Sequence, residues 1–274
     1  MKIYIMTDME GVCGVINHDD WVVPGGRYYE EGKKLLTLEV NAAIDGFFSS
    51  GADEIAVVDG HGAGGIDQSL LDRRAYYIRS TLGYPFMLDK TYDAAAWIGQ
   101  HAKAGAEYAH IAHTGWFNVL DYRINGISVG EFGQMAMIAA FLGVRAVFGS
   151  GDEAFTREAG QLVEGIETVA IKKGLTPGRG DEYDCEGYRN RNLSAMHMHP
   201  EKAKELIRQG AGKALKRYME NKLCFKLLDI KPPFIREVRY RPDGKTPAYR
   251  TYTEHADNII EMMNMPEEKR EIIM

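Results

Sequence analysis

Short apolar runs of strand length alternate along this chain with longer segments of helical periodicity. We expect strands over residues 3–6, 54–58, 74–79, 94–98, 145–148 and 168–172. The helical patterns cover residues 29–49, 131–142, a segment from 153 and residues 201–218. Strands separated by helices of this length are typical of a mostly parallel sheet with helices on both faces. We therefore expect an α/β fold.

The C-terminal part of the chain, from residue 231, has a different pattern. Residues 231–252 contain several prolines and a glycine and predict strands joined by turns, and residues 255–274 predict a helix with a polar end. We expect an α/β metal-binding catalytic domain over residues 1–200 and a smaller α+β subdomain over 201–274, a candidate oligomerisation element. Earlier in the chain, Asn125-Gly126 predicts a hairpin within residues 123–129.

Composition limits the classes of protein to consider. With 274 residues, 45% of them hydrophobic, the chain can bury a large core. The net charge of −6 and the lack of a Lys/Arg run argue against a nucleic-acid partner. No apolar stretch reaches the ~18 residues of a membrane span, and no signal peptide is recognisable. Three widely spaced cysteines suggest reduced thiols in a cytoplasmic protein, with Cys13 a small buried thiol.

Two acidic residues end the first strand. Asp8 and Glu10 stand two positions apart after residues 3–6, so a continuing strand would point both side chains to one side. Unpaired charges at the end of a buried strand are costly, and a cation would remove that cost. A turn with two solvated acids is the alternative interpretation of this stretch.

Later elements end in further ligand-type residues. His61 follows the second strand, His101 follows residues 94–98, and Glu131 lies at the junction of the hairpin and the next helix. In a parallel sheet the site lies beyond the carboxyl ends of the strands. Imidazoles and carboxylates together suit Zn²⁺, and also Mn²⁺ or Co²⁺. Five ligands exceed the usual set of one catalytic zinc and suit two ions that share a carboxylate and activate water.

Other histidines have simpler interpretations. Taken singly, His61 and His101 are each more often structural than metal-binding. His197 and His199 form a His-x-His pair, but we expect them to lead into the helix over 201–218. The segment 108–114 carries His110 and His113 and has no pattern that requires an imidazole for packing.

These motifs resemble the D-aminopeptidases of the dipeptide-transport operon type, the M55 class of zinc peptidases. The resemblance is carried by the segments Thr7-Asp8-Met9-Glu10-Gly11, Asp59-Gly60-His61, Gly99-Gln100-His101-Ala102, Ala112-His113-Thr114 and Val129-Gly130-Glu131-Phe132-Gly133, and by the helix-like residues 27–44. It is continuous over residues 1–152, weaker to about 218, and slight in the last fifty residues.

The resemblance implies a self-compartmentalising, zinc-dependent aminopeptidase that releases N-terminal D-amino acids such as D-alanine from short peptides. It also implies a large homo-oligomer, with a ring-shaped decamer as the expected form. On this resemblance Asp8 bridges two zinc ions, and Glu10, His61, His101 and Glu131 complete their coordination. His113 is then the catalytic residue that handles protons or stabilises the oxyanion, and His110 is a weaker candidate.

Two other functions compete with this one. The same two-metal site can hydrolyse a cyclic amide or a phosphoester, although Lys103 is the only basic residue close to the predicted ligands in sequence. The fold can also serve a non-catalytic binding protein. The intact set of charged ligands argues against that function, because unpaired buried charges are costly.

Overall fold

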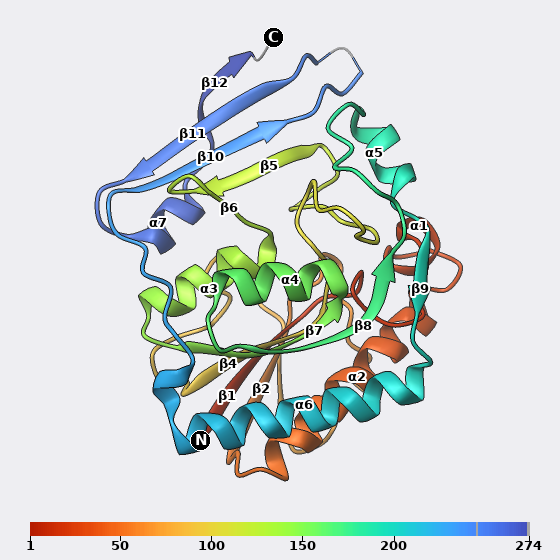
Figure 1. Ribbon diagram of the computed structural model, residues 1–274, viewed down its shortest axis with the longest axis vertical. Coiled ribbons are helices and arrows are strands. Elements are labelled where there is room, and N and C mark those ends of the chain that lie inside the picture. Colours follow the sequence, from red (N-terminus) through yellow and green to blue (C-terminus); the bar gives the residue numbers. More distant parts are fainter. Residues whose placement is uncertain (245, 273–274) are drawn as a thin grey trace.

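The computed structural model describes residues 1–244 and 246–272, and its largest element is a seven-stranded sheet (Figure 1). The strands are β1 (Lys2–Thr7), β2 (Glu54–Asp59), β3 (Tyr76–Ile78), β4 (Ala94–Gln100), β7 (Arg145–Asp152), β8 (Glu167–Gly174) and β9 (Ala195–His197). Their order is β3-β2-β1-β4-β7-β8-β9, and only the pairing of β8 with β9 is antiparallel. The predicted mostly parallel sheet is confirmed.

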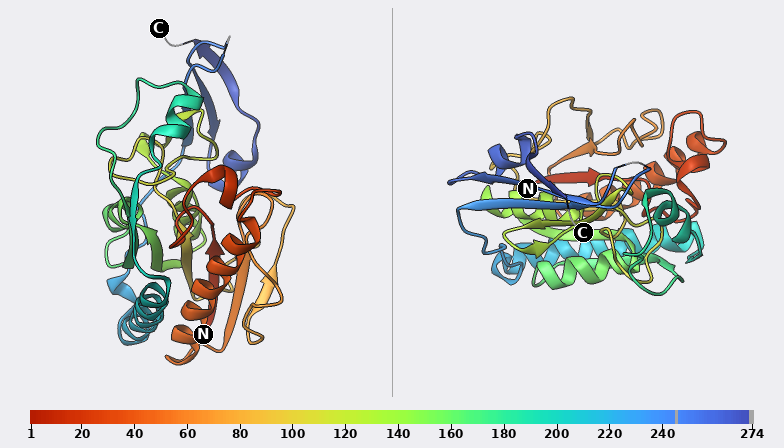
Figure 2. Two further views of the ribbon diagram at one scale, coloured as in Figure 1. Left: turned by 90° about the vertical axis from the view of Figure 1, so that its right-hand side faces the viewer. Right: turned by 90° about the horizontal axis from the view of Figure 1, so that it is seen from above.

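Helices cover both faces of this sheet, as predicted (Figures 1 and 2). They are α2 (Tyr29–Phe48) and α6 (Pro200–Glu220) on one face, and α3 (Glu131–Phe141) and α4 (Glu153–Leu162) on the other. Alternate side chains of β1 separate the two cores, because successive strand residues point to opposite faces. Ile3 and Ile5 pack in the core beneath α2 and α6, whereas Tyr4 and Met6 pack in the core beneath α3.

A second, antiparallel sheet lies at one end of the molecule (Figure 1). Its strands, in spatial order, are β12 (Glu268–Ile272), β11 (Tyr249–His255), β10 (Phe234–Tyr240), β5 (Val119–Ile124) and β6 (Ile127–Ser128). The helix α7 (Ile259–Asn264) contacts β10, β11 and α3. Its buried side chains therefore extend the core of the α3 face toward the second sheet.

The predicted hairpin is present, but it belongs to the second sheet. Asn125 and Gly126 both have positive φ, 49° and 80°, as a tight turn between β5 and β6 requires. Strand β5 then pairs with β10, which lies more than a hundred residues further along the chain. The helix α6 packs against α2 and the first sheet instead. The expected domain boundary at residue 200 thus does not follow the division between the two sheets.

The tail departs from the expected helix. The helix α7 ends at Asn264, and residues Glu268–Ile272 form strand β12 against β11. Pro266 explains the stop, since a proline lacks the N–H group that a helix requires and restricts the residue before it. Ile259 and Met263 of α7 are buried, but the helix does not continue through residues 268–272. The last two residues of the predicted stretch, 273 and 274, lie outside the described residues.

The remaining helices are short: α1 (His18–Trp21), α5 (Cys185–Arg191) and the 3₁₀ turn Lys222–Cys224. Among the described residues, no helix combines the length and the apolar character needed to cross a membrane. All three cysteines are unpaired, and Cys13 is buried as expected.

Candidate metal centre

The predicted ligands lie together at the carboxyl edge of the parallel sheet. Strand β1 has β2 on one side and β4 on the other, so the order of connections reverses between β1 and β4. Ligand sites of open α/β sheets lie at such a reversal. Asp8 and Glu10 follow β1, His61 lies just beyond β2, His101 follows β4 directly, and Glu131 opens helix α3.

Glycines allow the turn after β1 to touch the end of β4. The amide of Gly11 donates to the carbonyl oxygen of Gly99 at 2.8 Å. A Cβ atom on Gly11 would lie 2.2 Å from the carbonyl oxygen of Gln100, so no larger residue fits without moving the backbone. This close approach holds the carboxylates of Asp8 and Glu10 beside the end of β4.

Asp8 lies between two groups of candidate ligands. Its Oδ1 atom is 3.3 Å from Nδ1 of His61, and its Oδ2 atom is 3.1 Å from Nε2 of His101. The side-chain amide of Gln100 also donates to Oδ2, at 3.0 Å. Glu10 completes the first group, because its Oε2 atom is 3.3 Å from the same nitrogen of His61. One carboxylate thus serves both groups.

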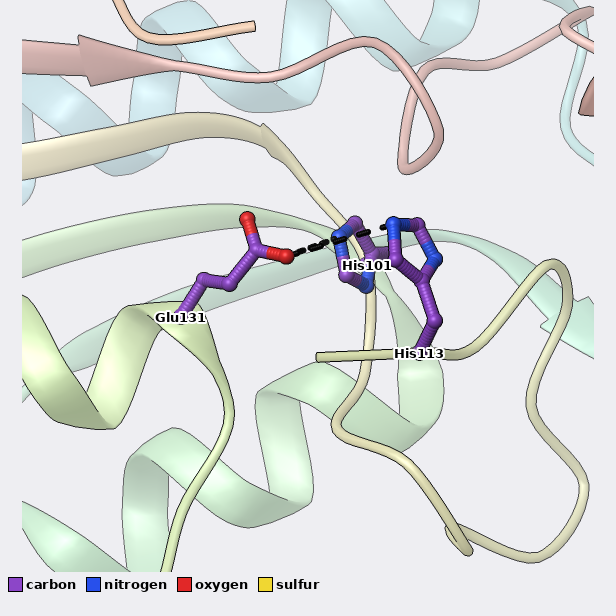
Figure 3. A group of neighbouring side chains, drawn as sticks. All are labelled: His101, His113 and Glu131. Carbon is purple, nitrogen blue, oxygen red and sulfur yellow. Dashed lines mark ion pairs between the residues drawn. The ribbon is translucent and has the colours of Figure 1, made fainter. Parts of the chain in front are cut away.

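The second group joins His101, His113 and Glu131 (Figure 3). Oε1 of Glu131 is 3.5 Å from Nε2 of His101 and 3.9 Å from Nε2 of His113. The two imidazole rings are stacked, with centroids 4.0 Å apart. The amide of Gly115 donates to the same Glu131 oxygen at 2.8 Å, which fixes the carboxylate in place.

Backbone carbonyls orient all three imidazoles. The contacts are His61 Nε2 to the oxygen of Val22 at 2.7 Å, His101 Nδ1 to that of Ala102 at 2.9 Å, and His113 Nδ1 to that of Ile111 at 2.9 Å. A carbonyl oxygen can only accept, so each of these nitrogens carries a proton. In the neutral ring the other nitrogen then presents its lone pair to the carboxylates. Histidine ligands of metals are held in this way.

This donor set fits a divalent cation. Asp8, Glu10 and His101 are each at least 94% buried, and buried polar atoms ordinarily have a partner. Oε2 of Glu10 and Nε2 of His101 have no hydrogen-bond partner in the described part of the chain, and both face the cluster. Imidazole nitrogen and carboxylate oxygen are the ligands of zinc sites. A cation at this point would satisfy both atoms.

Without a cation, protons on His61 and His101 balance part of the negative charge of the carboxylates. Burial disfavours the imidazolium, but the negative charge of Glu10 and Asp8 outweighs it and raises the pKa of His61 well above its ordinary value. Glu131 and Asp8 raise the pKa of His101 in the same way. Burial would raise the pKa of Glu131, yet His101 lowers it to about 2. The carboxylates therefore remain charged and attract a cation.

Two cavities of about 280 Å³ each open on the cluster. They share Asp8, Gly60, Gly62, Gly115 and Glu131. The first, here called the histidine-side cavity, is also lined by His18, Val23, His113 and Trp116. The second, the glutamine-side cavity, is also lined by Met6, Tyr84, Phe86, Gln134 and Met135. A ligand bound at the cluster can therefore extend in two directions.

The five predicted ligands and His113 all lie at this cluster, whereas His110, His197 and His199 lie elsewhere. Nε2 of His110 is 2.9 Å from the carbonyl oxygen of Ile16, and its ring packs edge-on against His197. His199 is the N-cap of α6 and accepts a hydrogen bond from the backbone amide of Glu201. It therefore leads into that helix, as predicted. Within residues 1–244 and 246–272, none of these three joins a metal-binding group.

Two residues of the site, Gln100 and His18, were not predicted from the sequence. Gln100 stands between Gly99 and His101 in a motif already noted. Only the structure shows that its side-chain amide donates a hydrogen bond to Asp8. His18 is buried, packs edge-on against Trp116 and lines the histidine-side cavity. Gln100 could have been found from the Gly99-Gln100-His101-Ala102 segment, whereas no motif or spacing identifies His18.

Comparisons with known proteins agree with this arrangement. The sequence model of the family Peptidase_M55, described as D-aminopeptidase, matches residues 1–256. The D-aminopeptidase of Bacillus subtilis (strain 168) is 33% identical to the chain over 181 residues, which are 64% of this chain. The matched part spans 65% of the length of that relative.

A solved structure matches nearly the whole fold. It is the Zn-dependent D-aminopeptidase DppA from Bacillus subtilis, described as a self-compartmentalizing protease. The match has a TM-score of 0.80 and 25% sequence identity, and it covers 96% of this chain and 94% of that chain. The similarity therefore includes the second sheet as well as the parallel one.

Proposed function

The chain belongs to the Peptidase_M55 family of D-aminopeptidases, and we propose that it is a zinc-dependent aminopeptidase. Its substrates are short peptides, from which it releases an N-terminal D-amino acid such as D-alanine. The observation that carries this proposal is the position of Asp8, which has one carboxylate oxygen toward each of two histidine–carboxylate groups. The zinc dependence of the similar DppA supports it.

The proposed centre holds two zinc ions per chain. Asp8 would be shared by both ions, Glu10 and His61 would hold one of them, and His101 and Glu131 would hold the other. Bound zinc lowers the pKa of a water molecule toward about 7 and polarises the carbonyl group of the scissile bond. Mn²⁺ or Co²⁺ would suit the same mixed nitrogen and oxygen ligands. The two metal-binding groups, which meet at Asp8, support the count of two.

His113 is proposed as the residue that moves the proton. Its Nδ1 atom donates to the carbonyl oxygen of Ile111. Nε2 therefore faces the cluster, on the side where the histidine-side cavity opens. Burial, the largest cause, lowers the pKa of His113 and so favours the neutral ring. Neutral Nε2 can take a proton from the attacking water and return it to the departing amine.

The proposal extends to assembly and location. The similar DppA is a self-compartmentalizing protease, and on that basis we propose a homo-oligomer, in the form of a ring-shaped decamer. Light scattering coupled to size-exclusion chromatography measures the subunit count directly. The three unpaired thiols favour a reducing compartment, and we propose the cytoplasm.

A phosphoester is not favoured as the substrate. Among the described residues, neither cavity beside the cluster is lined by a lysine or an arginine. Phosphate recognition ordinarily uses such cations. The scissile bond of a peptide has no comparable requirement, because its carbonyl and amide groups carry no formal charge.

One experiment tests the proposed function. The metal content of the purified and zinc-supplemented protein is measured, and release of alanine from D-Ala-D-Ala and L-Ala-L-Ala is compared at equal concentration. We expect about two zinc ions per chain and faster release from the D-dipeptide. Stoichiometric metal without hydrolysis of either dipeptide would contradict the aminopeptidase assignment, and absence of metal in both samples would contradict the centre.

A further inference from the structure

We propose that the glutamine-side cavity binds the side chain of the N-terminal residue of the substrate and selects an uncharged, apolar one. This inference rests on the proposed aminopeptidase function and specifies which peptides the enzyme accepts. It also assigns the histidine-side cavity to the departing part of the peptide. Asp8, Glu131 and three glycines separate the two cavities.

The position of His113 decides which cavity receives which part. This residue lines the histidine-side cavity but not the glutamine-side cavity. A group that gives a proton to the departing amine must lie within reach of that amine. The departing peptide therefore extends past His113, and the released N-terminal residue lies on the opposite side of the cluster.

The size of the glutamine-side cavity suits one residue. Pockets for drug-sized ligands measure roughly 300–1,000 Å³, whereas this cavity measures about 280 Å³. An aminopeptidase binds a single residue on the N-terminal side of the scissile bond, so a cavity of this size is sufficient on that side.

The walls of the cavity favour an apolar side chain. Met6, Phe86 and Met135 supply apolar surface, and no basic residue lines the cavity within the described ranges. An acidic side chain would lose water without gaining a cation as partner. The Tyr84 hydroxyl donates to Oε1 of Gln134, so this amide retains its N–H groups for a substrate oxygen.

The wall that carries Phe86 is held in place before substrate binds. The hydroxyl of buried Tyr4 donates to the carbonyl oxygen of Phe86 at 3.0 Å. The ring of Phe86 packs on that of Tyr84, with centroids 4.8 Å apart. Asn264 of α7 donates to the carbonyl oxygen of Tyr84 at 2.7 Å. A preformed wall limits the size of the side chain that can enter.

A matched pair of variants tests the assignment. Phe86→Ala enlarges the glutamine-side cavity, and Trp116→Ala enlarges the histidine-side cavity by removal of another aromatic ring. The zinc-loaded parent and both variants are assayed on X-Gly dipeptides with X as Ala, Leu, Phe or Glu, and on Ala-Y dipeptides with Y as Gly, Leu or Phe. The configuration at each position is the one that the parent hydrolyses.

Phe86→Ala is expected to raise kcat/KM for Phe-Gly relative to Ala-Gly by about tenfold or more, the scale of pocket contacts of this kind. It should leave the ratio of Ala-Phe to Ala-Gly within about twofold, and Trp116→Ala should show the reverse pattern. The parent should hydrolyse Glu-Gly at least about tenfold less efficiently than Leu-Gly.

The opposite pattern, in which Trp116→Ala alters the preference for the first residue of the dipeptide, would show that the two cavities are assigned the wrong way round. Unchanged ratios in both variants would show that neither cavity is a subsite for side chains. If Phe86→Ala does not fold by circular dichroism, Phe86→Leu makes a smaller enlargement with the same expected direction. A parent that hydrolyses no peptide overturns the proposed function itself, whereas an active parent with these contrary ratios overturns this inference alone.

Discussion

The ammonium group of Lys172 donates a hydrogen bond to the backbone carbonyl oxygen of Glu10. Lys172 lies on β8, is only 3% exposed, and is also 3.4 Å from the carbonyl oxygen of Val15. Burial lowers the pKa of Lys172 to about 8, although the charge of Asp152 opposes that shift. Lys172 of β8 thus holds the turn after β1, and the carboxylate of Glu10 in that turn lies beside His61.

Lys172→Met is expected to destabilise the protein by about 1–3 kcal/mol, because two buried carbonyl groups lose their donor. It should also weaken zinc binding by the Asp8–Glu10–His61 group, since Glu10 is no longer held. Urea unfolding and zinc titration measure the two effects.

The neighbouring Lys173 is the matched control for that variant. It lies on the same strand, its side chain is 40% exposed, and it pairs with Glu153 at 3.1 Å. Lys173→Met should change stability by no more than about 1 kcal/mol, as for exposed ion pairs. Equal effects of both substitutions on stability and zinc binding would contradict the role of Lys172 in holding the turn that carries Glu10.

Substitution of the ligands should separate the two proposed metal sites. Asp8→Ala removes the shared carboxylate and should lose both ions, whereas His61→Ala and Glu131→Ala should each lose about one and abolish activity. All three variants should still fold, because the cores on either side of the sheet are intact. Metal analysis after dialysis gives the stoichiometry.

His110→Ala is the control for metal loss, since His110 contacts Ile16 and His197 rather than the cluster. It should retain both ions. Full metal content in the His61→Ala and Glu131→Ala variants would mean that the ions bind elsewhere.

His113→Ala tests proton transfer. If Nε2 of His113 acts in the transition state, the variant should keep both metals and lose about 10²-fold or more in kcat with a modest change in KM. Steady-state kinetics on the best dipeptide, together with metal analysis, checks this.

The contrary outcomes for His113 are separable. Loss of one metal in His113→Ala would make the residue a ligand in the group with His101 and Glu131. If His113→Ala turns over peptide at the parent rate and His110→Ala is inactive, His110 is the catalytic histidine. Activity and metal retained in both variants would exclude a histidine from proton transfer.

Zinc affinity should rise with pH. The raised pKa of His61 and His101 means that these groups hold protons in the metal-free protein near neutral pH, and zinc must displace them. In that form their charge stabilises the fold fully below about pH 6.5, the ordinary value for histidine, and the contribution is lost as pH rises through the raised pKa. Proton release on zinc binding, measured by calorimetry in two buffers, checks the sign.

The carboxylates act in the opposite direction. The pKa of Glu131 is lowered to about 2, so its contribution to stability is present above about pH 4.3, the ordinary value for glutamate, and is lost as pH falls toward 2. Activity should therefore fall on the acidic side together with metal content. Zinc affinity that does not change between pH 6 and pH 8, or full activity after the metal has left, would contradict this account.

Much of the fold could be predicted because the relevant signals are local. The apolar runs and the helical periodicity identified β1, β2, β4, β7 and the helices between them. Carboxyl ends of parallel strands meet at one edge, so ligand-type residues after those strands were predicted to converge. Asp8, Glu10, His61 and His101 do so. The Asn125-Gly126 turn is likewise a property of two adjacent residues.

Other features depend on contacts between distant parts of the chain. The pairing of β5 with β10 joins strands more than a hundred residues apart, and no local pattern specifies it. The presence of His113 rather than His110 at the cluster depends on a loop in which Ile111 has a φ of 53°. The contacts of Lys172 with Glu10 and of Gln100 with Asp8 likewise exist only once the sheet has formed.

The sequence by itself determined the α/β class, the strand ends that carry ligands and the resemblance to a peptidase family. These features depend on periodicity and motifs, which are properties of residues close together in the chain. Only the tertiary structure decided which oxygen of Asp8 faces which histidine, where the two cavities open and which strand pairs with β5. The physical reason is that such contacts follow from the packing of whole elements, whose side chains meet across long separations in the chain.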